Sequence, residues 1–145
     1  MEEYFMKIAE VVKLRSGCTR RQVGAVFVID NRIVSTGYNQ APSKIKHCNQ
    51  VGCTVFNGHC IRAIHAEMNG IFNATKAGQS LQHSTAYITS FPCLRCLMAL
   101  RNAGVTDFVY KESYTYEPHE VDLLTEVLSG FGVRQWPKPP LPEKK

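Results

Sequence analysis

The sequence lacks three features that would assign it at once to a broad class: a long apolar run, a high density of cysteine and a concentrated block of basic residues. Its best uncharged stretch, residues 77–94, is rich in Gln, Ser, Thr and His, so no membrane-spanning helix is expected. Residues 1–5 are acidic where a signal peptide would be basic, and we therefore expect a cytoplasmic protein without a membrane partner. Six cysteines among 145 residues are too few for a disulfide scaffold, and in reducing cytosol they favour metal binding or catalysis.

The charge balance argues against a nucleic-acid-binding protein. The chain has 17 Lys and Arg against 12 Asp and Glu, a net charge of +5, and three Lys and one Glu of this total lie in residues 138–145. The remaining excess is not gathered into the basic stripe that is typical of nucleic-acid binders, so no such partner is expected. With 44% apolar residues, the chain is expected to form one domain over residues 1–136, followed by a Pro- and Lys-rich tail over residues 137–145.

Hydrophobic periodicity predicts the secondary structure. Helices are expected over residues 2–16, 61–77 and 93–103 and from residue 118, and strands over residues 23–29, 33–38, 84–90, 105–110 and 133–136. Residues 39–59 show no period, and a loop of this length is usually functional or held by something. Strands separated by helices indicate a mainly parallel sheet covered on both faces, with the first two strands forming an antiparallel hairpin. The prediction is a three-layer α/β/α fold with a five-stranded mixed sheet.

Two short motifs predict a zinc site with catalytic chemistry: H-A-E at residues 65–67 and P-C-L-R-C at residues 92–96. Cys93 and Cys96 are three residues apart at a helix start, so they share a face and the helix N-terminus stabilises their thiolates. Together with His65 they supply three zinc ligands and leave a fourth position open for water, which is the catalytic arrangement. Glu67 is then expected beside this water, where it takes a proton and returns it to a substrate nitrogen.

The pairing of H-x-E with P-C-x-x-C is the signature of zinc nucleobase deaminases. The chain resembles the cytidine deaminase superfamily and, within it, the deoxycytidylate (dCMP) deaminases. The likeness runs from about Phe5 to Trp136 and is carried by residues 23–26, 35–39, 60–69, 91–96 and 102–105. One departure is Gln40-Ala41, where the family usually has Gly followed by a small residue.

This resemblance implies a cytidine-deaminase-like fold and the hydrolytic deamination of dCMP to dUMP with release of ammonia, which supplies dUMP for thymidylate synthesis. In the implied mechanism, hydroxide on the zinc attacks C4 of cytosine while Glu67 protonates N3 and then the leaving amine. Asn39 would contact the deoxyribose, the Ala66 backbone N–H the cytosine carbonyl, and Tyr114 the base. The resemblance also implies a homo-oligomer, commonly a hexamer, with dCTP as activator and dTTP as inhibitor, each bound with Mg²⁺.

The four other cysteines predict a second, structural zinc. Cys18, Cys48, Cys53 and Cys60 would provide a closed four-thiolate site, and the long loop has no other evident reason to be ordered. Members of the family sometimes carry a second zinc. His59 or His47 is an alternative ligand, and the cysteines are otherwise small buried apolar side chains.

A zinc held by four thiolates is formally dianionic, so nearby cations would partly neutralise it. A monophosphate substrate also needs cationic or N–H donors, and the same residues are candidates for that role. These residues are Arg15, Arg20, Arg21, Lys44, Lys46 and Arg62.

Two other functions compete with dCMP deamination. A deaminase of tRNA or single-stranded DNA would need a basic, aromatic channel for the strand, and the sequence shows no such stripe. A non-catalytic interaction module stapled by zinc would use His65, Cys93 and Cys96 only structurally. Glu67 argues against it, because a structural site has no use for an acid beside an open coordination position. The cysteine-bearing loop and the modest charge favour the nucleotide substrate.

Overall fold

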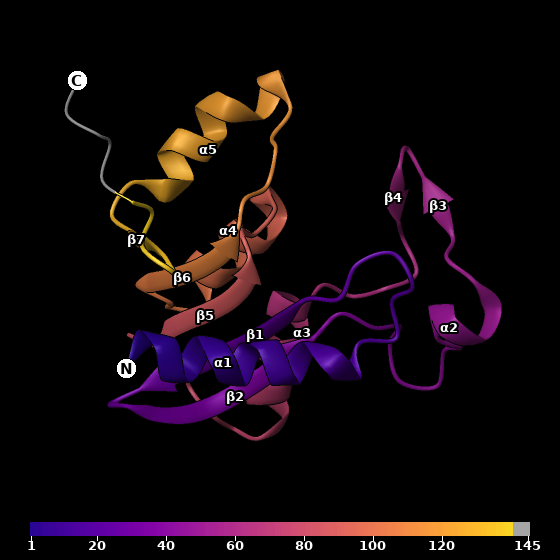
Figure 1. Cartoon of the computed structure of the whole chain (residues 1–145), viewed down its shortest axis with the longest axis horizontal. Helices are drawn as coiled ribbons and strands as arrows, with labels where there is room; N and C mark the ends of the chain where they lie inside the picture. Colours follow the sequence, from indigo (N-terminus) through magenta and orange to yellow (C-terminus); the bar gives the residue numbers. More distant parts are fainter. Residues whose placement is uncertain (141–145) are drawn as a thin grey trace.

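The computed structural model describes residues 1–140; residues 141–145, the end of the expected tail, lie outside the described part. Its main sheet has five strands in the order β2-β1-β5-β6-β7 (Figure 1). The strands are β1 (Gly24–Ile29), β2 (Arg32–Tyr38), β5 (Thr85–Ser90), β6 (Asp107–Glu112) and β7 (Gly132–Gln135). β1 runs antiparallel to both its neighbours, β2 and β5, whereas β6 is parallel to β5 and β7. The predicted mixed sheet is confirmed, with four strands in one direction and β1 inserted between β2 and β5.

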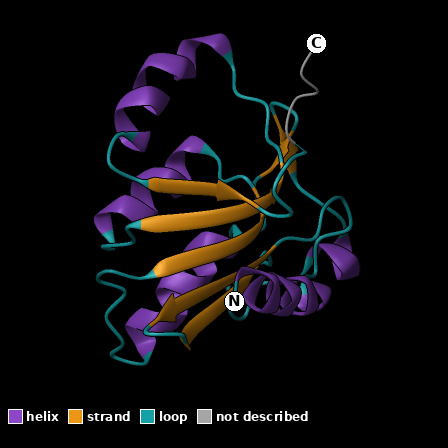
Figure 2. Ribbon diagram, turned by 60° about the vertical axis from the view of Figure 1, so that its left-hand side comes forward, coloured by secondary structure: helices purple, strands orange, loops and turns teal. Residues whose placement is uncertain are grey.

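Helices cover both faces of this sheet (Figure 2). Helix α1 (Glu2–Val12) packs on one face, and α3 (Ala66–Lys76), α4 (Leu94–Asn102) and α5 (Val121–Leu128) belong to the other. The alternation of side chains along a strand explains the two cores. In β1, Ala25 and Phe27 join the core under α3 and α4, while Val26 and Val28 join the core under α1. The three-layer α/β/α architecture predicted from the sequence is therefore confirmed. No helix among residues 1–140 combines the length and the apolar character that crossing a bilayer requires.

Two predicted helix boundaries are wrong. The first helix ends at Val12 and continues as a 3₁₀ turn over Lys13–Arg15, and Gly17 does not adopt the left-handed conformation of a helix-ending glycine. Helix α3 begins at Ala66, five residues later than its apolar spacing suggested. The preceding segment is extended instead, because Ile64 exchanges two backbone hydrogen bonds with Gln40, of 2.7 and 3.1 Å. This bridge leaves His65 as the N-cap residue of α3.

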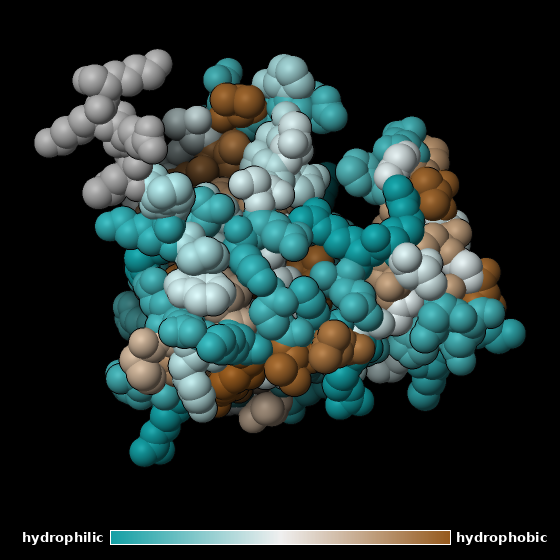
Figure 3. All heavy atoms as spheres, viewed as in Figure 1, coloured by the Kyte–Doolittle hydropathy of each residue, from teal (hydrophilic) through white to brown (hydrophobic). Residues whose placement is uncertain are grey.

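The predicted loop is partly ordered as a projecting segment over residues 41–63, which we call the arm. It contains α2 (Cys48–Val51) and a small hairpin of β3 (Val55–Phe56) and β4 (His59–Cys60). Asn57 and Gly58, at the hairpin turn, both have positive φ angles, as a tight two-residue turn requires. The arm stands apart from the sheet in Figure 1, and apolar side chains are gathered on it in Figure 3. The Gln40–Ile64 bridge closes its neck next to His65.

Strand β2 and helix α3 approach each other backbone to backbone at Gly37. A Cβ atom at this position would lie 2.1 Å from the Ala66 carbonyl oxygen and 2.3 Å from the Gly70 nitrogen. We expect Gly37→Ala to destabilise the fold by about 1–3 kcal/mol, because neither backbone atom can move aside without shifting the helix. Thermal unfolding checks this, with Thr36→Ala on the same strand as the control. Equal melting temperatures for Gly37→Ala and wild type would show that β2 and α3 separate freely.

Candidate active site

The three predicted ligands of the catalytic zinc come together where two helices begin. His65 is the N-cap of α3 and Cys93 is the N-cap of α4, and Cys96 lies in the first turn of α4. The Nδ1 atom of His65 is 3.5 Å from the Cys93 sulfur and 3.4 Å from the Cys96 sulfur. The ligand atoms of all three residues lie within 4.8 Å of one another.

This donor set fits a tetrahedral zinc ion. Zinc bonds of about 2.3 Å to sulfur and about 2.0–2.1 Å to nitrogen place the two ligand atoms of a tetrahedral pair about 3.6 Å apart. The measured separations of 3.5 and 3.4 Å are close to this value. Two sulfurs and one imidazole nitrogen occupy three corners of such a tetrahedron, which leaves the fourth for water or substrate.

The electrostatics of the cluster favour an ionised thiol. A hydrogen bond with Cys96, helped by one with His65, lowers the pKa of the Cys93 thiol to about 4 despite partial burial. The hydrogen bond between His65 and Cys93 also raises the pKa of the His65 imidazole. The N-termini of α3 and α4 both point their positive dipole ends at the cluster, which further stabilises negative charge there. The contact with Cys93, together with burial, raises the pKa of the Cys96 thiol, so the negative charge of the cluster is placed on Cys93.

Glu67 has the burial that a proton carrier needs. It lies in the first turn of α3, two residues after His65, and only 4% of it is exposed. Burial raises the pKa of its carboxyl, and the neighbours that act on it include His65, Cys93 and Cys96. The carboxyl is therefore next to the metal-binding groups, in surroundings that favour its protonated form.

A cavity of 440 Å³ opens above these groups. His65, Glu67 and Cys93 contribute to its wall, whereas Cys48 and Cys53 do not. The other lining residues that the sequence singled out are Cys18, Arg20, Arg21, Asn39, His59, Cys60, Ala66 and Tyr114. Ser90 and Phe91 also line the cavity and were missed. Their position at the carboxyl end of β5, directly before Pro92, is a signal that would have found them.

Hydrogen bonds to the protein occupy most of the polar atoms of the Asn39 side chain and fix it in the cavity wall. Its Oδ1 atom accepts hydrogen bonds from the Val23 amide at 2.8 Å and from the Ser16 hydroxyl at 2.7 Å. Its amide nitrogen donates to the Arg21 carbonyl at 2.6 Å. Among the described residues, only one acceptor is bonded to this nitrogen, so its second N–H is left for a ligand.

Ala66 places a backbone donor at the cavity. It is fully buried and occupies the first position of α3. The first N–H groups of a helix have no acceptor within that helix, so this N–H is available to a substrate oxygen.

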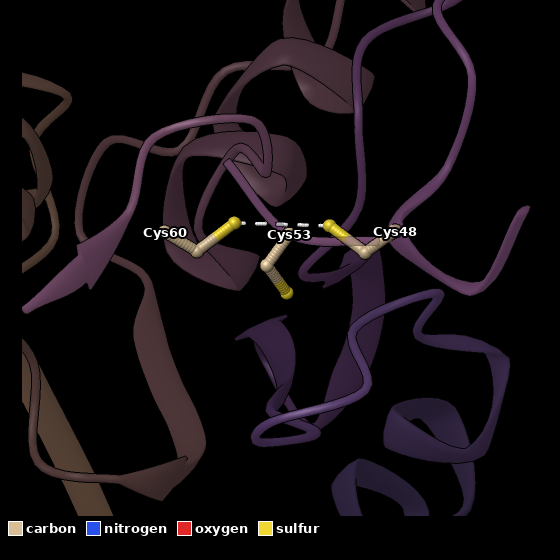
Figure 4. Close-up of side chains that lie close together, drawn as sticks. All are labelled: Cys48, Cys53 and Cys60. Carbon is tan, nitrogen blue, oxygen red and sulfur yellow. Dashed lines mark hydrogen bonds between the residues drawn. The ribbon is translucent and has the colours of Figure 1, made fainter. Parts of the chain in front are cut away.

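Three of the four cysteines expected in a second metal site form a cluster. The sulfurs of Cys48, Cys53 and Cys60 lie within 4.8 Å of one another, and Figure 4 shows Cys53 between the other two. The Cys48 and Cys60 sulfurs are 3.7 Å apart, close to the separation of about 3.8 Å for two thiolates on a tetrahedral zinc. Burial and contacts with Cys53 and Cys60 raise the pKa of Cys48 to about 12. Burial opposes ionisation of Cys60, but hydrogen bonds from the backbone amides of Ala63 and Arg62 and contacts with Cys48 and Cys53 together lower its pKa to about 7.

Cys18 lies outside this cluster. Its sulfur accepts the Arg21 backbone N–H at 3.4 Å, while the neighbouring Thr19 hydroxyl lies 3.5 Å from the Cys53 sulfur. The structure thus groups three thiols rather than the expected four, and neither His47 nor His59 belongs to the group among the described residues.

The comparisons with known proteins agree with this geometry. Residues 1–112 match the family described as the cytidine and deoxycytidylate deaminase zinc-binding region. ComE operon protein 2 of Bacillus subtilis is 36% identical over 133 residues, covering 92% of this chain and 69% of that protein. The deoxycytidylate deaminase of Saccharomyces cerevisiae is 33% identical over 141 residues, covering 93% of this chain and 44% of that enzyme. A crystal structure of dCMP deaminase from cyanophage S-TIM5, in complex with dCMP and dUMP, has a TM-score of 0.77 at 28% identity, covering 92% of this chain and 95% of that one.

Fold and site together define an α/β/α zinc-binding protein with a buried carboxylate beside the metal-binding groups. The chain belongs to the cytidine and deoxycytidylate deaminase family. It spans 69% of the Bacillus protein and less than half of the yeast enzyme, so the activities of those whole proteins bear on this chain only by proposal.

Proposed function

We propose that this protein is a zinc-dependent deaminase that hydrolyses dCMP to dUMP and ammonia. The observation that carries the proposal is the buried Glu67 carboxyl beside the convergent His65, Cys93 and Cys96 side chains, at a cavity of nucleotide size. Its likeness to relatives that are named deoxycytidylate deaminases supports dCMP as the substrate.

The proposed chemistry divides between the metal and Glu67. When bound by His65, Cys93 and Cys96, zinc lowers the pKa of water so that a nucleophile exists at neutral pH. Glu67 accepts one proton of the water and delivers it to N3 of cytosine, then accepts the second proton from the new C4 hydroxyl and delivers it to the leaving nitrogen. Over the reaction the C4–N4 bond breaks, a C4–O bond forms and ammonia departs.

Three further groups are proposed to orient the substrate. The Ala66 backbone N–H donates to the cytosine carbonyl, which keeps the base over the site. The remaining N–H of Asn39 donates to the deoxyribose, and Tyr114 packs against the base. All three line the same cavity as Glu67.

The substrate phosphate is proposed to bind Arg20. Both Arg20 and Arg21 line the cavity, but Arg21 is already engaged with the Ser90 hydroxyl at 2.7 Å and with the Glu112 carboxylate at 3.4 Å. Arg20 makes no ion pair with any described residue, and one of its nitrogens donates only to the Gly58 carbonyl at 3.2 Å. His59 lies beside it on the cavity wall. Of the two arginines on the cavity wall, Arg20 is therefore the one that has no ion pair among the described residues and can meet a phosphate.

The proposed activity is tested by incubating the zinc-replete protein with equal concentrations of dCMP and deoxycytidine and following the loss of cytosine absorbance. We expect turnover of dCMP and little turnover of deoxycytidine. Failure on dCMP by a protein shown to hold zinc would contradict the proposal and favour a polynucleotide substrate.

Replacement of Arg20 by Gln tests the phosphate contact. A charge-assisted hydrogen bond contributes about 1.5–3 kcal/mol, so we expect the KM for dCMP to rise by about 10- to 100-fold. Any residual turnover of deoxycytidine, which has no phosphate, should be unchanged. Arg32→Gln, at an exposed position on β2, is the control. An equal loss on both substrates would show that Arg20 supports the fold rather than the phosphate.

We also propose a second, structural zinc bound by Cys48, Cys53 and Cys60. Their separations support this, and the fourth position is left for Cys18 or His59, both of which line the adjoining cavity. Metal analysis of Cys18→Ser and His59→Gln distinguishes the two.

Regulation by dCTP and dTTP with Mg²⁺, and assembly into a homohexamer, belong to the same proposal. They rest on the resemblance to dCMP deaminases, and an oligomer is also supported by the exposed Phe72 on α3 and Met98 on α4. The proposed domain boundary, with the catalytic domain over residues 1–136, agrees with β7 ending at Gln135.

A further inference from the structure

The segment between β6 and α5 brings Tyr114 to the cavity without support from its own backbone. β6 ends at Glu112, and a 3₁₀ turn begins at Pro118. Within residues 1–140, no backbone hydrogen bond joins residues 113–116 to the rest of the chain. Side chains must therefore hold this segment in place.

Tyr116 is the side chain that makes this connection. Its hydroxyl donates to the backbone carbonyl of Pro92, a buried residue that directly precedes Cys93. Its ring packs edge-on against Phe91, with centroids 5.8 Å apart and an interplanar angle of 89°. Both partners belong to the rigid junction between β5 and α4.

The Tyr116 ring also packs against Tyr114. The two centroids are 4.9 Å apart and the rings are inclined by 70°, in the edge-to-face arrangement that aromatic pairs favour. Tyr114 lines the cavity together with His65, Glu67 and Cys93. Its place in the wall is thus determined by a ring that is itself tethered to Pro92.

We propose that Tyr116 is a positioning residue, which acts through Tyr114 and determines how tightly the pyrimidine base is bound. This inference rests on the proposed function, because it takes the base to lie against Tyr114. The phenolic hydroxyl carries the effect, since the aromatic packing alone leaves the segment free to slide along Phe91. The residue touches neither the substrate nor the reacting atoms.

The test compares Tyr116→Phe with Tyr110→Phe. Tyr110 is a matched control because its ring also packs on Phe91, at 4.7 Å, while its hydroxyl makes no hydrogen bond to a described residue. Loss of one hydrogen bond worth about 0.5–1.5 kcal/mol predicts a rise of about 2- to 10-fold in the KM for dCMP, with kcat changed less than twofold. Zinc content should be unchanged. Tyr110→Phe should behave as wild type.

A double-mutant cycle establishes whether Tyr116 acts through Tyr114. Adding Tyr116→Phe to Tyr114→Leu should raise KM no further, because the side chain that it positions is already gone. Independent KM effects of the two changes would overturn the proposal. So would a fall in kcat with loss of zinc, which would mean that the tether acts on Cys93 through the Pro92 carbonyl.

Limited proteolysis of the substrate-free protein by chymotrypsin, which cleaves after both Tyr and Phe, separates this inference from the proposed function. Faster cleavage within residues 113–117 in Tyr116→Phe, but not in Tyr110→Phe, is expected whether or not dCMP is the substrate. An unchanged cleavage rate would overturn the tether itself. Absence of dCMP turnover by wild type would instead defeat the proposed function, and with it the role in base binding.

Discussion

Glu67→Gln is expected to bind zinc normally and to deaminate dCMP about 10²- to 10⁴-fold more slowly than wild type, which is the usual contribution of general acid–base catalysis. The amide has nearly the shape of the carboxyl, but it cannot accept a proton and pass it on. Because Glu67 is not among the three grouped metal ligands, the ligand set His65, Cys93 and Cys96 stays complete. Single-turnover kinetics together with elemental zinc analysis measures both properties.

Glu126→Gln provides the control, because it makes the same chemical change at an exposed position on α5. It should leave kcat and zinc content unaltered. If Glu67→Gln kept more than a few per cent of wild-type activity, the role assigned to its carboxyl would be wrong. If it lost zinc, Glu67 would be supporting the metal ligands rather than moving protons.

The second large effect is expected from Cys60→Ser. Structural zinc contributes about 10–16 kcal/mol in small zinc domains, far more than two-residue strands and one helical turn contribute to the arm. We therefore expect the zinc content to fall from two per chain to one and amide exchange to rise over residues 41–63. Because Gly58, His59 and Cys60 line the cavity, kcat/KM for dCMP should also fall at least about tenfold, equivalent to about 1.4 kcal/mol.

Ser43→Ala, an exposed change in the same arm, is the comparison and should retain two zinc ions and full activity. A wild-type protein that holds one zinc per chain with a well-protected arm would contradict the second site. Loss of the arm's protection without a change in kcat/KM would show that the arm does not shape the substrate cavity.

The metal centre could be predicted from the sequence because its information is local. Cys93 and Cys96 lie three residues apart at a helix start, and Glu67 lies two residues from His65, so short-range geometry already places each pair together. The succession of strands and helices along the chain likewise indicated a sheet covered on both faces. Asn57-Gly58 was an equally local signal for a hairpin turn, and it was present in the sequence but not used.

The first residue of α3 could not be predicted from local spacing. Apolar spacing continues back to Ile61, but Ile64 pairs with Gln40, a residue 24 positions earlier. The departure from the family pattern at Gln40 is accommodated there, since Gln40 takes part in this bridge without a positive φ angle. Hydrophobic periodicity depends only on residues close together in the sequence, so it cannot indicate a pairing with a residue 24 positions away.

The sequence by itself predicted the proposed metal ligands, the proposed proton carrier and the layered fold, because these follow from spacing within single elements and from the order of the elements along the chain. Only the tertiary structure decided which arginine of the cavity wall has no ion pair within residues 1–140 and which cysteines meet. Arg21 pairs with Glu112, 91 residues away, whereas Arg20 has no such partner in that part of the chain, and Cys48 meets Cys60 while Cys18 stays outside the cluster. These outcomes depend on contacts between distant segments, whose relative placement is set by how the whole sheet and its helices pack.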